Sequence, residues 1–323
     1  MKISASVFLI LLSLLIMTSC NNSGFKRTKS GLLYKIISDG KGSVAKKGQY
    51  IKFNYTQKVR DSVLVSTLNM PLPAYSRVDS VGPIYSPVEI FRMLRKGDSV
   101  VVVQYADSLE RKYHQQLPPY IHKKDQLTLT MKVLDLFAVD SLLLKDRDQL
   151  LAAEKGKEVA ALQDYFKRNN ISGVQETSKG NFYQILTQGT GPKADTGKKV
   201  SINYSGFDLD GNYFDSNTDS TKQRQRHPLV PFDVVIGRGG AVPGMLDVVG
   251  NFREGDKARI YIPGVNGYGQ QGSGGVIKPF ETLVFDIEID SVRNAPPMPA
   301  RRLFGQKMPA NVPSPKQVPP GHN

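Results

Sequence analysis

The sequence predicts an α+β protein in which two related β-rich domains are joined by a helical linker. The first observation is an internal repeat, because the segment from Gly31 to Ile36 resembles the segment from Gly180 to Ile185, which begins 149 residues later. The second is a charged stretch between the copies whose apolar residues have the spacing of an amphipathic helix. Together they predict two similar sheets on either side of a helix.

The repeat continues without a gap as far as Tyr55 in the first copy and Tyr204 in the second. Chance apolar periodicity would not keep glycines and tyrosines in register, so the copies should share turns at which glycine adopts a positive φ. Each copy ends in a strand of alternating character, Leu127–Val133 in the first and Leu283–Ile289 in the second. We therefore predict domains at 29–136 and 177–292. The gapless matches pair Gly31 with Gly180, Gly40 with Gly189, Gly42 with Gly191, Gly48 with Gly197 and Tyr55 with Tyr204.

The remaining segments flank these domains. Residues 137–176 are predicted to form a helical linker, with Gly156 as a point at which the helix could break and Asn169-Asn170 as its end. A simple connecting helix is favoured, and a dimerising helix or a chaperone arm stays open. Residues 293–323 are basic and rich in proline, and such a tail cannot build a core, so it is predicted to be disordered.

Composition narrows the possible partners. The formal net charge is +14, but no block of basic residues stands alone, so we expect no nucleic-acid partner. One cysteine excludes a disulfide within the chain. We expect no metal and no cofactor, because the histidines do not have the spacing of metal ligands; they are His114, His122, His227 and His322.

The N-terminus has the features of an export signal. Lys2 precedes an apolar run from Val7 to Met17, which is too short for a standard transmembrane helix and fits a secretory signal peptide. The run leads through two small residues to Cys20, an arrangement that resembles the lipobox of bacterial lipoproteins. The resemblance implies a signal peptide at 1–19, a lipid on Cys20, a tether at 20–28 and a place in the bacterial cell envelope, at the outer membrane facing the periplasm. A secreted protein with a free thiol is the alternative.

The second copy carries a series of ordered motifs. They are Tyr204 in an alternating strand, Phe214-Asp215-Ser216 after a hairpin, Pro231-Phe232, Ala241-Val242-Pro243-Gly244, Ile262-Pro263 with Tyr268-Gly269, and Thr282–Ile289. In this order they resemble an FKBP-type peptidyl-prolyl cis-trans isomerase, and the match covers about a third of the chain. The resemblance implies that each domain is an antiparallel twisted sheet wrapped on a short helix.

The same resemblance implies roles for individual residues. Five residues would form the catalytic pocket: Tyr204, Phe214, Asp215, Tyr268 and Phe285. Four more would bind the substrate: Phe232, Val242 through its backbone N–H, Met245 and Ile277. The family often has tryptophan at the pocket floor, where this chain has Met245, and methionine should give a softer apolar base.

The residue types agree with this chemistry. Rotation about an X–Pro bond faces a barrier of about 18–20 kcal/mol, because amide resonance is lost in the twisted state. No proton transfer is needed, so an enzyme must bind the twisted amide better than the planar one. Aromatic walls with one or two hydrogen-bond donors can do this. The substrates would be unfolded or nascent exported proteins that contain X–Pro bonds.

The first copy departs from the pattern. At the 149-residue offset, Val65 and Ser66 replace Phe214 and Asp215. In the matching last strands, Leu129 replaces Phe285, so we predict a degenerate domain. This keeps a second function open, namely a non-catalytic periplasmic chaperone or assembly factor that binds clients on FKBP-like domains. The loop from Asn217 to Val230 holds Lys222, Arg224, Arg226 and His227, and it is either a solvated insertion or a segment that tunes substrate choice. The sequence does not determine the oligomeric state.

Overall fold

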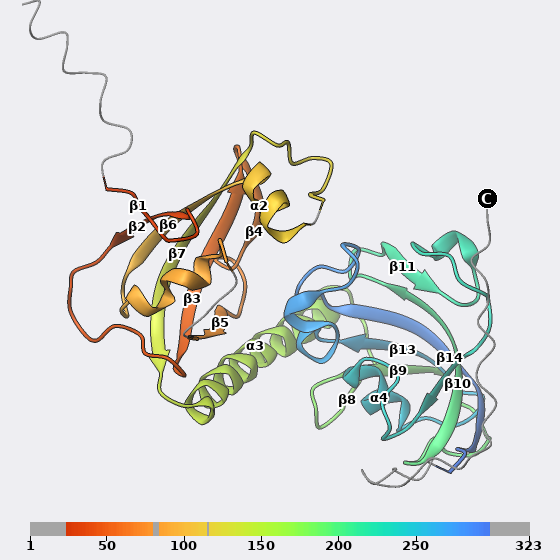
Figure 1. Cartoon of the computed structure of the whole chain (residues 1–323). Coiled ribbons are helices and arrows are strands. Elements are labelled where there is room, and N and C mark those ends of the chain that lie inside the picture. The colour runs from red at the N-terminus through yellow and green to blue at the C-terminus, as the bar shows by residue number, and fades with distance from the viewer. Residues whose placement is uncertain (1–23, 80–83, 115, 298–323) are drawn as a thin grey trace, which may run out of the picture.

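The structure, a computed structural model, describes residues 24–79, 84–114 and 116–297, and contains two antiparallel sheets with a long helix between them (Figure 1). The first sheet and its helices are β1 (Lys26–Arg27), β2 (Leu33–Ile37), β3 (Tyr50–Val59), β4 (Ser62–Ser66), β5 (Ala74–Arg77), η1 (Pro87–Met93), β6 (Ser99–Tyr105), α2 (Ala106–Tyr113) and β7 (Gln126–Phe137).

The long helix is α3 (Asp140–Arg168). The second sheet and its helices are β8 (Gln175–Glu176), β9 (Phe182–Thr187), β10 (Lys198–Phe207), β11 (Tyr213–Ser216), η2 (Ser220–Lys222), β12 (Phe232–Val235), α4 (Pro243–Val249), β13 (Lys257–Ile262), η3 (Gly264–Asn266), η4 (Gly269–Gln271) and β14 (Leu283–Asn294).

The two sheets have the same order of strands. The first runs β1-β2-β6-β7-β3-β4 with β5 also on β3, and the second runs β8-β9-β13-β14-β10-β11 with β12 also on β10. Even an irregularity recurs: the register shifts between Lys52 and Phe53 in the first sheet, and between Ser201 and Ile202 at the matching place in the second. The predicted α+β class with two antiparallel sheets is confirmed.

Each sheet has its own apolar core, formed where a short helix packs against it. In the second sheet, α4 covers one face, and Met245, Val248 and Val249 are buried among strand residues. The opposite face holds a smaller cluster in which α3 contributes Leu162 and Phe166. Because both faces are covered, β14 is buried almost continuously at its start, whereas β7 keeps the predicted alternation.

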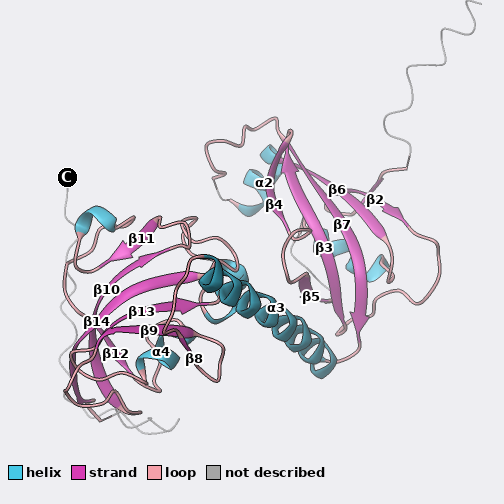
Figure 2. Ribbon diagram, turned by 180° about the vertical axis from the view of Figure 1, so that it is seen from behind, coloured by secondary structure: helices cyan, strands magenta, loops and turns pink. Residues whose placement is uncertain are grey.

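Helix α3 is continuous, so the possible break at Gly156 is not present. An exposed glycine costs a helix about 1 kcal/mol relative to alanine, and this helix is held at both ends. Near its start, Asp146 accepts hydrogen bonds from Lys52 Nζ at 2.9 Å and from Tyr75 Oη at 2.6 Å, both on the first sheet. Near its end, the apolar cluster with the second sheet holds it. Figure 2 shows the helix lying between the two sheets.

Two predicted boundaries need correction. The tether at 20–28 includes β1, because Lys26 and Arg27 pair with β2. The tail predicted from residue 293 begins later, because Arg293 and Asn294 still pair with β10. Cys20, the signal peptide at 1–19 and the tail from residue 298 lie outside the described residues. Among the helices that the structure describes, none is both long enough and apolar enough to cross a membrane.

The matched glycines serve two different purposes. Gly48 and Gly197 both have positive φ, at 87° and 85°, as predicted for shared turns. Gly189 does not; a Cβ there would lie 2.4 Å from the carbonyl oxygen of Glu254, so glycine is needed because two backbone segments touch. The expectation of a positive φ was therefore wrong at Gly189 and also at Gly191.

The burial of Glu158 on α3 should make the stability of the protein depend on pH. Its Oε2 accepts the N–H of Val265 at 3.0 Å, but its buried Oε1 has no hydrogen-bond partner within the described structure. Burial raises the pKa of Glu158 from 4.5 to about 7. The folded state therefore holds a proton that the unfolded state has already lost, so the free energy of unfolding falls as pH rises from 4.5 to about 7.

We expect Glu158→Gln to raise the free energy of unfolding at pH 8 by roughly 1–3 kcal/mol and to leave it unchanged at pH 4. Denaturant unfolding at both pH values measures this. Asp164→Asn, at an exposed position of the same helix, is the control. An equal effect of Glu158→Gln at both pH values would contradict the assignment.

Candidate active site

One cavity of the second sheet gathers all nine pocket residues that the sequence singled out. It has a volume of about 370 Å³ and lies between the strands and the start of α4. The nine residues lie on four strands, at α4 and in two loops. They are Tyr204 on β10, Phe214 and Asp215 on β11, Phe232 on β12, Val242 and Met245 at α4, Tyr268 and Ile277 in loops, and Phe285 on β14. Segments far apart in the sequence thus meet at one site.

The aromatic rings form the walls by packing edge to face. Phe214 and Phe285 have ring centroids 5.5 Å apart at 85°, and Tyr204 lies 6.0 Å from Phe285 at 72°. Tyr204 also packs 6.1 Å from Phe232. Such pairs are favourable because the positive edge of one ring meets the negative face of the next. The walls are therefore rigid and apolar.

Helix α4 supplies the base of the cavity. Met245 and Ile277 are both buried, whereas Tyr268 is 41% exposed at the rim. Val242 is the N-cap of α4, and its carbonyl accepts the N–H of Met245. Its own N–H donates no hydrogen bond within the described part of the chain, so a donor is available beside the apolar base.

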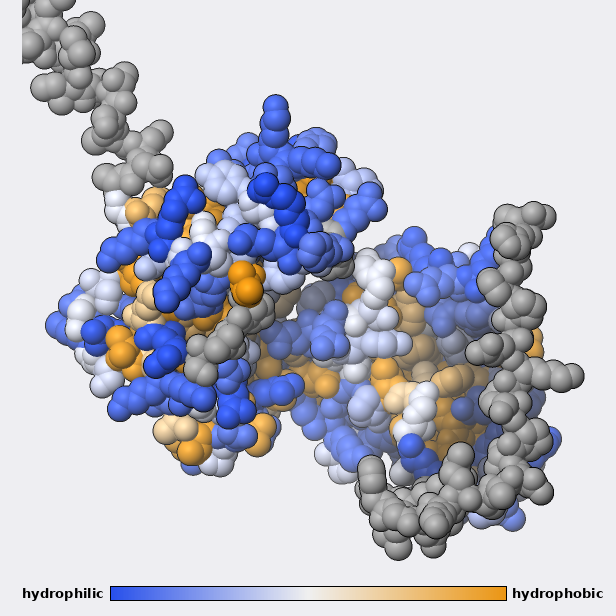
Figure 3. All heavy atoms as spheres, in the orientation of Figure 1, coloured by the Kyte–Doolittle hydropathy of each residue, from blue (hydrophilic) through white to orange (hydrophobic). Residues whose placement is uncertain are grey.

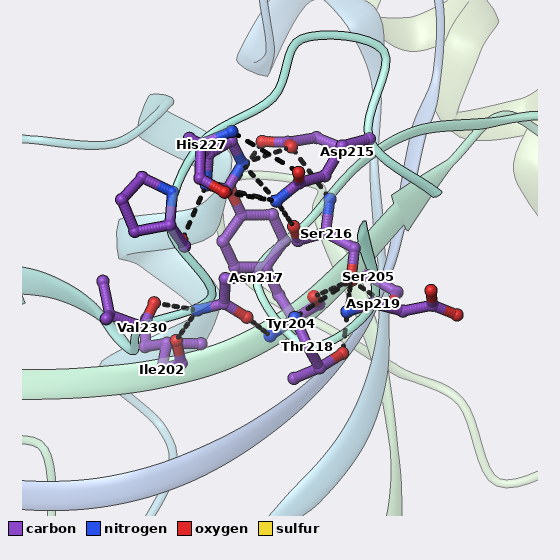
Figure 4. Close-up of polar contacts among 12 residues, drawn as sticks. Ile202, Tyr204, Ser205, Asp215, Ser216, Asn217, Thr218, Asp219, His227 and Val230 are labelled. Atoms are coloured by element: carbon purple, nitrogen blue, oxygen red, sulfur yellow. Dashed lines mark hydrogen bonds and ion pairs between the residues drawn. The ribbon is translucent and has the colours of Figure 1, made fainter. Parts of the chain in front are cut away.

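A polar network lies on one side of the cavity, around Asp215 (Figure 4). The carboxylate accepts the hydroxyl of Tyr204 at 2.6 Å and the N–H of Ser216 at 2.8 Å. The Nε2 of His227 lies 2.7 Å from Oδ1, the oxygen that also accepts the N–H of Ser216, whereas Tyr204 donates to Oδ2. The side chains of Tyr204, Asp215 and His227 thus point toward one another.

Burial and the contacts with Asp215 shift the pKa values of Tyr204, Tyr268 and His227. Burial raises the pKa of Tyr204 well above its usual value, and the hydrogen bond to Asp215 adds to the effect. The pKa of Tyr268 is raised mainly by burial and also by the charge of Asp215. The hydrogen bond to Asp215 raises the pKa of His227, which favours its cation. Both tyrosines are neutral donors at physiological pH.

Asn217 holds β10 beside the loop that follows β11. Its side chain is buried, accepts the N–H of Tyr204 at 2.7 Å, and donates to the carbonyl oxygens of Ile202 at 2.8 Å and Val230 at 3.0 Å. These bonds fix the strand that presents Tyr204. The loop from Asn217 to Val230 is thus anchored at its ends, and it brings Arg224 and His227 to the cavity, whereas Lys222 and Arg226 do not line it.

Gly206 is a pocket residue that sequence reasoning missed. A Cβ at this position would lie 2.5 Å from the ring of Phe214 and 2.8 Å from that of Phe285. Glycine is thus what allows the two rings to meet across β10. The signal was present in the repeat, because Gln57 occupies the matching position in the first copy.

The strand registers correct the comparison with the first copy. Gly206 pairs with Asp215, and the matching Gln57 pairs with Val65. Beyond this pair the second hairpin is one residue longer, so the counterparts of Phe214 and Asp215 are Leu64 and Val65, and not Val65 and Ser66. Leu129 is the counterpart of Phe285, as predicted, because the two residues pair with Gln57 and Gly206. Ala74 stands at the place of Phe232.

Known proteins are similar in sequence to this part of the chain. The family model described as FKBP-type peptidyl-prolyl cis-trans isomerase matches residues 191–290. A curated FK506-binding protein of Neisseria meningitidis serogroup B is 36% identical over 110 residues, which are 34% of this chain and 94% of that protein. The FKBP-type peptidyl-prolyl cis-trans isomerase FkpA of Escherichia coli is 32% identical over 147 residues, which are 46% of this chain and 48% of that protein.

A solved structure of a peptidyl-prolyl cis-trans isomerase from Pseudomonas syringae covers 43% of this chain and 95% of its own, at 30% identity and a TM-score of 0.34. The relative from Neisseria is matched over nearly its whole length, and the family match contains all nine pocket residues. The chain therefore belongs to the family of FKBP-type peptidyl-prolyl cis-trans isomerases.

Proposed function

We propose that this isomerase works by holding a twisted X–Pro amide in the aromatic cavity, without a covalent intermediate. The observation that carries the proposal is the cavity itself, in which rings of Tyr204, Phe214, Phe232 and Phe285 surround a space of about 370 Å³. Pockets for small ligands measure about 300–1,000 Å³, so a proline ring with its flanking amide can be enclosed.

The chemistry follows from the polarity of the walls. A planar amide is more polar than a twisted one, so apolar walls disfavour the ground state relative to the transition state. The free N–H of Val242 can hold a flanking carbonyl, and the hydroxyl of Tyr268 can hold another. Tyr204 would act through Asp215, by keeping that carboxylate in place.

The test is catalysis of X–Pro rotation in short peptides by the full chain. We expect Tyr268→Phe, which keeps the ring and removes the hydroxyl, to lower kcat/KM several-fold, because one hydrogen bond contributes about 1 kcal/mol. Exchange between the cis and trans forms, followed by NMR, measures the rate. Absence of catalysis by the unmodified chain would refute the proposal, and complete loss in Tyr268→Phe would point to proton transfer instead.

We further propose that the substrates are exported proteins and that the chain is anchored by a lipid on Cys20. The apolar run before Cys20 and the small residues next to it support this. Cys20→Ser should move the protein from the membrane fraction to the soluble fraction, and only the unmodified chain should take up a labelled fatty acid. Retention of the variant in the membrane would exclude the anchor.

A second candidate function is the binding of unfolded clients without catalysis. The first domain favours it, since large apolar side chains are exposed there, including Val63 on β4 and Leu68 and Ile84 in loops, at 54%, 63% and 64%. Figure 3 shows apolar patches of this kind within a largely hydrophilic surface. A variant that has lost isomerase activity but still suppresses aggregation of an unfolded protein would assign client binding to this surface.

A further inference from the structure

Arg224 lies at the rim of the cavity, and its guanidinium group forms no ion pair within the described residues. Its backbone N–H donates to the carbonyl of Phe214, at 3.3 Å, and its Nε donates to the carbonyl of Tyr213, at 3.1 Å. These bonds fix the start of the guanidinium group against β11 and leave both terminal nitrogens without a hydrogen bond within the described residues. No carboxylate in the described structure forms an ion pair with it, although the side chain lines the cavity.

The carboxylate that lines the cavity already has hydrogen-bond partners. Asp215 is the one acidic residue among those that line the cavity, and three donors occupy it: Tyr204, Ser216 and His227. Both ring nitrogens of His227 face acceptors, since Nε2 meets Asp215 and Nδ1 lies 3.0 Å from the carbonyl of Pro228. The cationic ring satisfies both contacts, because each nitrogen then carries a proton.

The other charged side chains of this loop add no net charge to the cavity wall. Lys222 pairs with Asp219 at 3.7 Å and lies over the ring of Tyr213. Arg226 is exposed and does not line the cavity. The side chain of Gln223 contacts the ring of His227 and is uncharged. Arg224 is therefore the uncompensated charge at the cavity wall.

Building on the proposed isomerase function, we propose that Arg224 determines substrate specificity, and that the enzyme selects prolyl segments with an acidic residue directly next to the proline. A guanidinium group can bind a carboxylate with two parallel hydrogen bonds. Arg224 is itself exposed, so the attraction is that of a surface ion pair, which a two-bond geometry can raise to about 1 kcal/mol, or about 5-fold.

The contact between His227 and Asp215 links this preference to pH. When His227 loses its proton, the charge of Asp215 is no longer balanced and repels an incoming carboxylate. His227 has its pKa raised by Asp215, so its cation persists to a higher pH than in a free histidine. The preference for acidic segments therefore declines as pH rises through the pKa of His227.

The experiment uses two sets of peptides. In the first set the residue directly before the proline is glutamate, glutamine or lysine, and in the second set the residue directly after the proline is varied in the same way. The full chain is assayed by NMR exchange, which needs no coupling protease. We expect kcat/KM in at least one set to be about 5- to 10-fold higher for glutamate than for glutamine, to be lowest for lysine, and to lose most of this ratio in high salt.

Arg224→Ala should bring the glutamate-to-glutamine ratio close to one. Arg226→Ala removes the same charge from the same loop and should keep the ratio, so it controls for the general field of the loop. The ratio should also fall between pH 6 and pH 8.5, and His227→Gln should hold it at the high-pH level throughout. Equal rates for glutamate and glutamine in both sets, or equal effects of the two arginine variants, would overturn the proposal. Absence of catalysis on every peptide would instead refute the isomerase mechanism.

Discussion

Phe285→Ala is expected to lower the free energy of unfolding by about 3–5 kcal/mol and to abolish catalysis. Phe285 is only 5% exposed and packs edge to face against both Phe214 and Tyr204. Its removal leaves a hole in the core and takes away the ring that joins two walls of the cavity. Chemical denaturation measures the first effect, and NMR exchange on an X–Pro peptide measures the second.

Phe285→Leu is the matched control, because Leu129 occupies the equivalent place in the first sheet. Leucine fills much of the volume, so we expect a loss of stability of about 1 kcal/mol, with a loss of catalysis that remains large. This variant separates stability from pocket shape. If Phe285→Leu kept full activity, the ring would not be part of the catalytic wall.

Gly206→Gln should lower kcat/KM by about 100-fold or more, which corresponds to about 2.7 kcal/mol. The new Cβ would lie within 3 Å of the rings of both Phe214 and Phe285, so at least one ring must leave its place. Forcing extra atoms into a packed region costs about 1–3 kcal/mol of stability as well. The backbone itself is not strained, because Gly206 does not have a positive φ.

The reverse change in the first sheet, Gln57→Gly, tests whether the effect is specific to the cavity. It alters the equivalent strand position and should leave catalysis unchanged, because Leu64 and Leu129 provide no aromatic wall there. Both variants are compared by unfolding and by NMR exchange. Undiminished activity in Gly206→Gln would show that the two rings need not meet for catalysis. If that variant folds, it also provides the inactive protein with which to test client binding by the first domain.

The sequence alone determined the repeat, the α+β class and nine of the residues that line the cavity. These predictions rest on short motifs whose residues are close together in the chain, such as Phe214-Asp215, or on positions repeated at a constant offset, such as Tyr55 and Tyr204. Each motif carries its own turn or strand, and a strand alternates its side chains between two faces. Residues on one face of a strand can therefore be named before their contacts are known, whereas their roles in the pocket were implied by the resemblance to the family.

The tertiary structure decided what happens where the chain leaves regular structure. The loop before Phe232 brings His227 onto Asp215 twelve residues away, and no local pattern specifies that contact. The hairpin before Phe214 is one residue longer than its counterpart, and only the strand pairing reveals which residues correspond. Gly206 matters because rings from two other strands meet over it, and Gly156 does not break α3 because packing at both ends holds the helix. In each case the deciding energy comes from contacts between residues that are distant in the chain, which a sequence pattern does not contain.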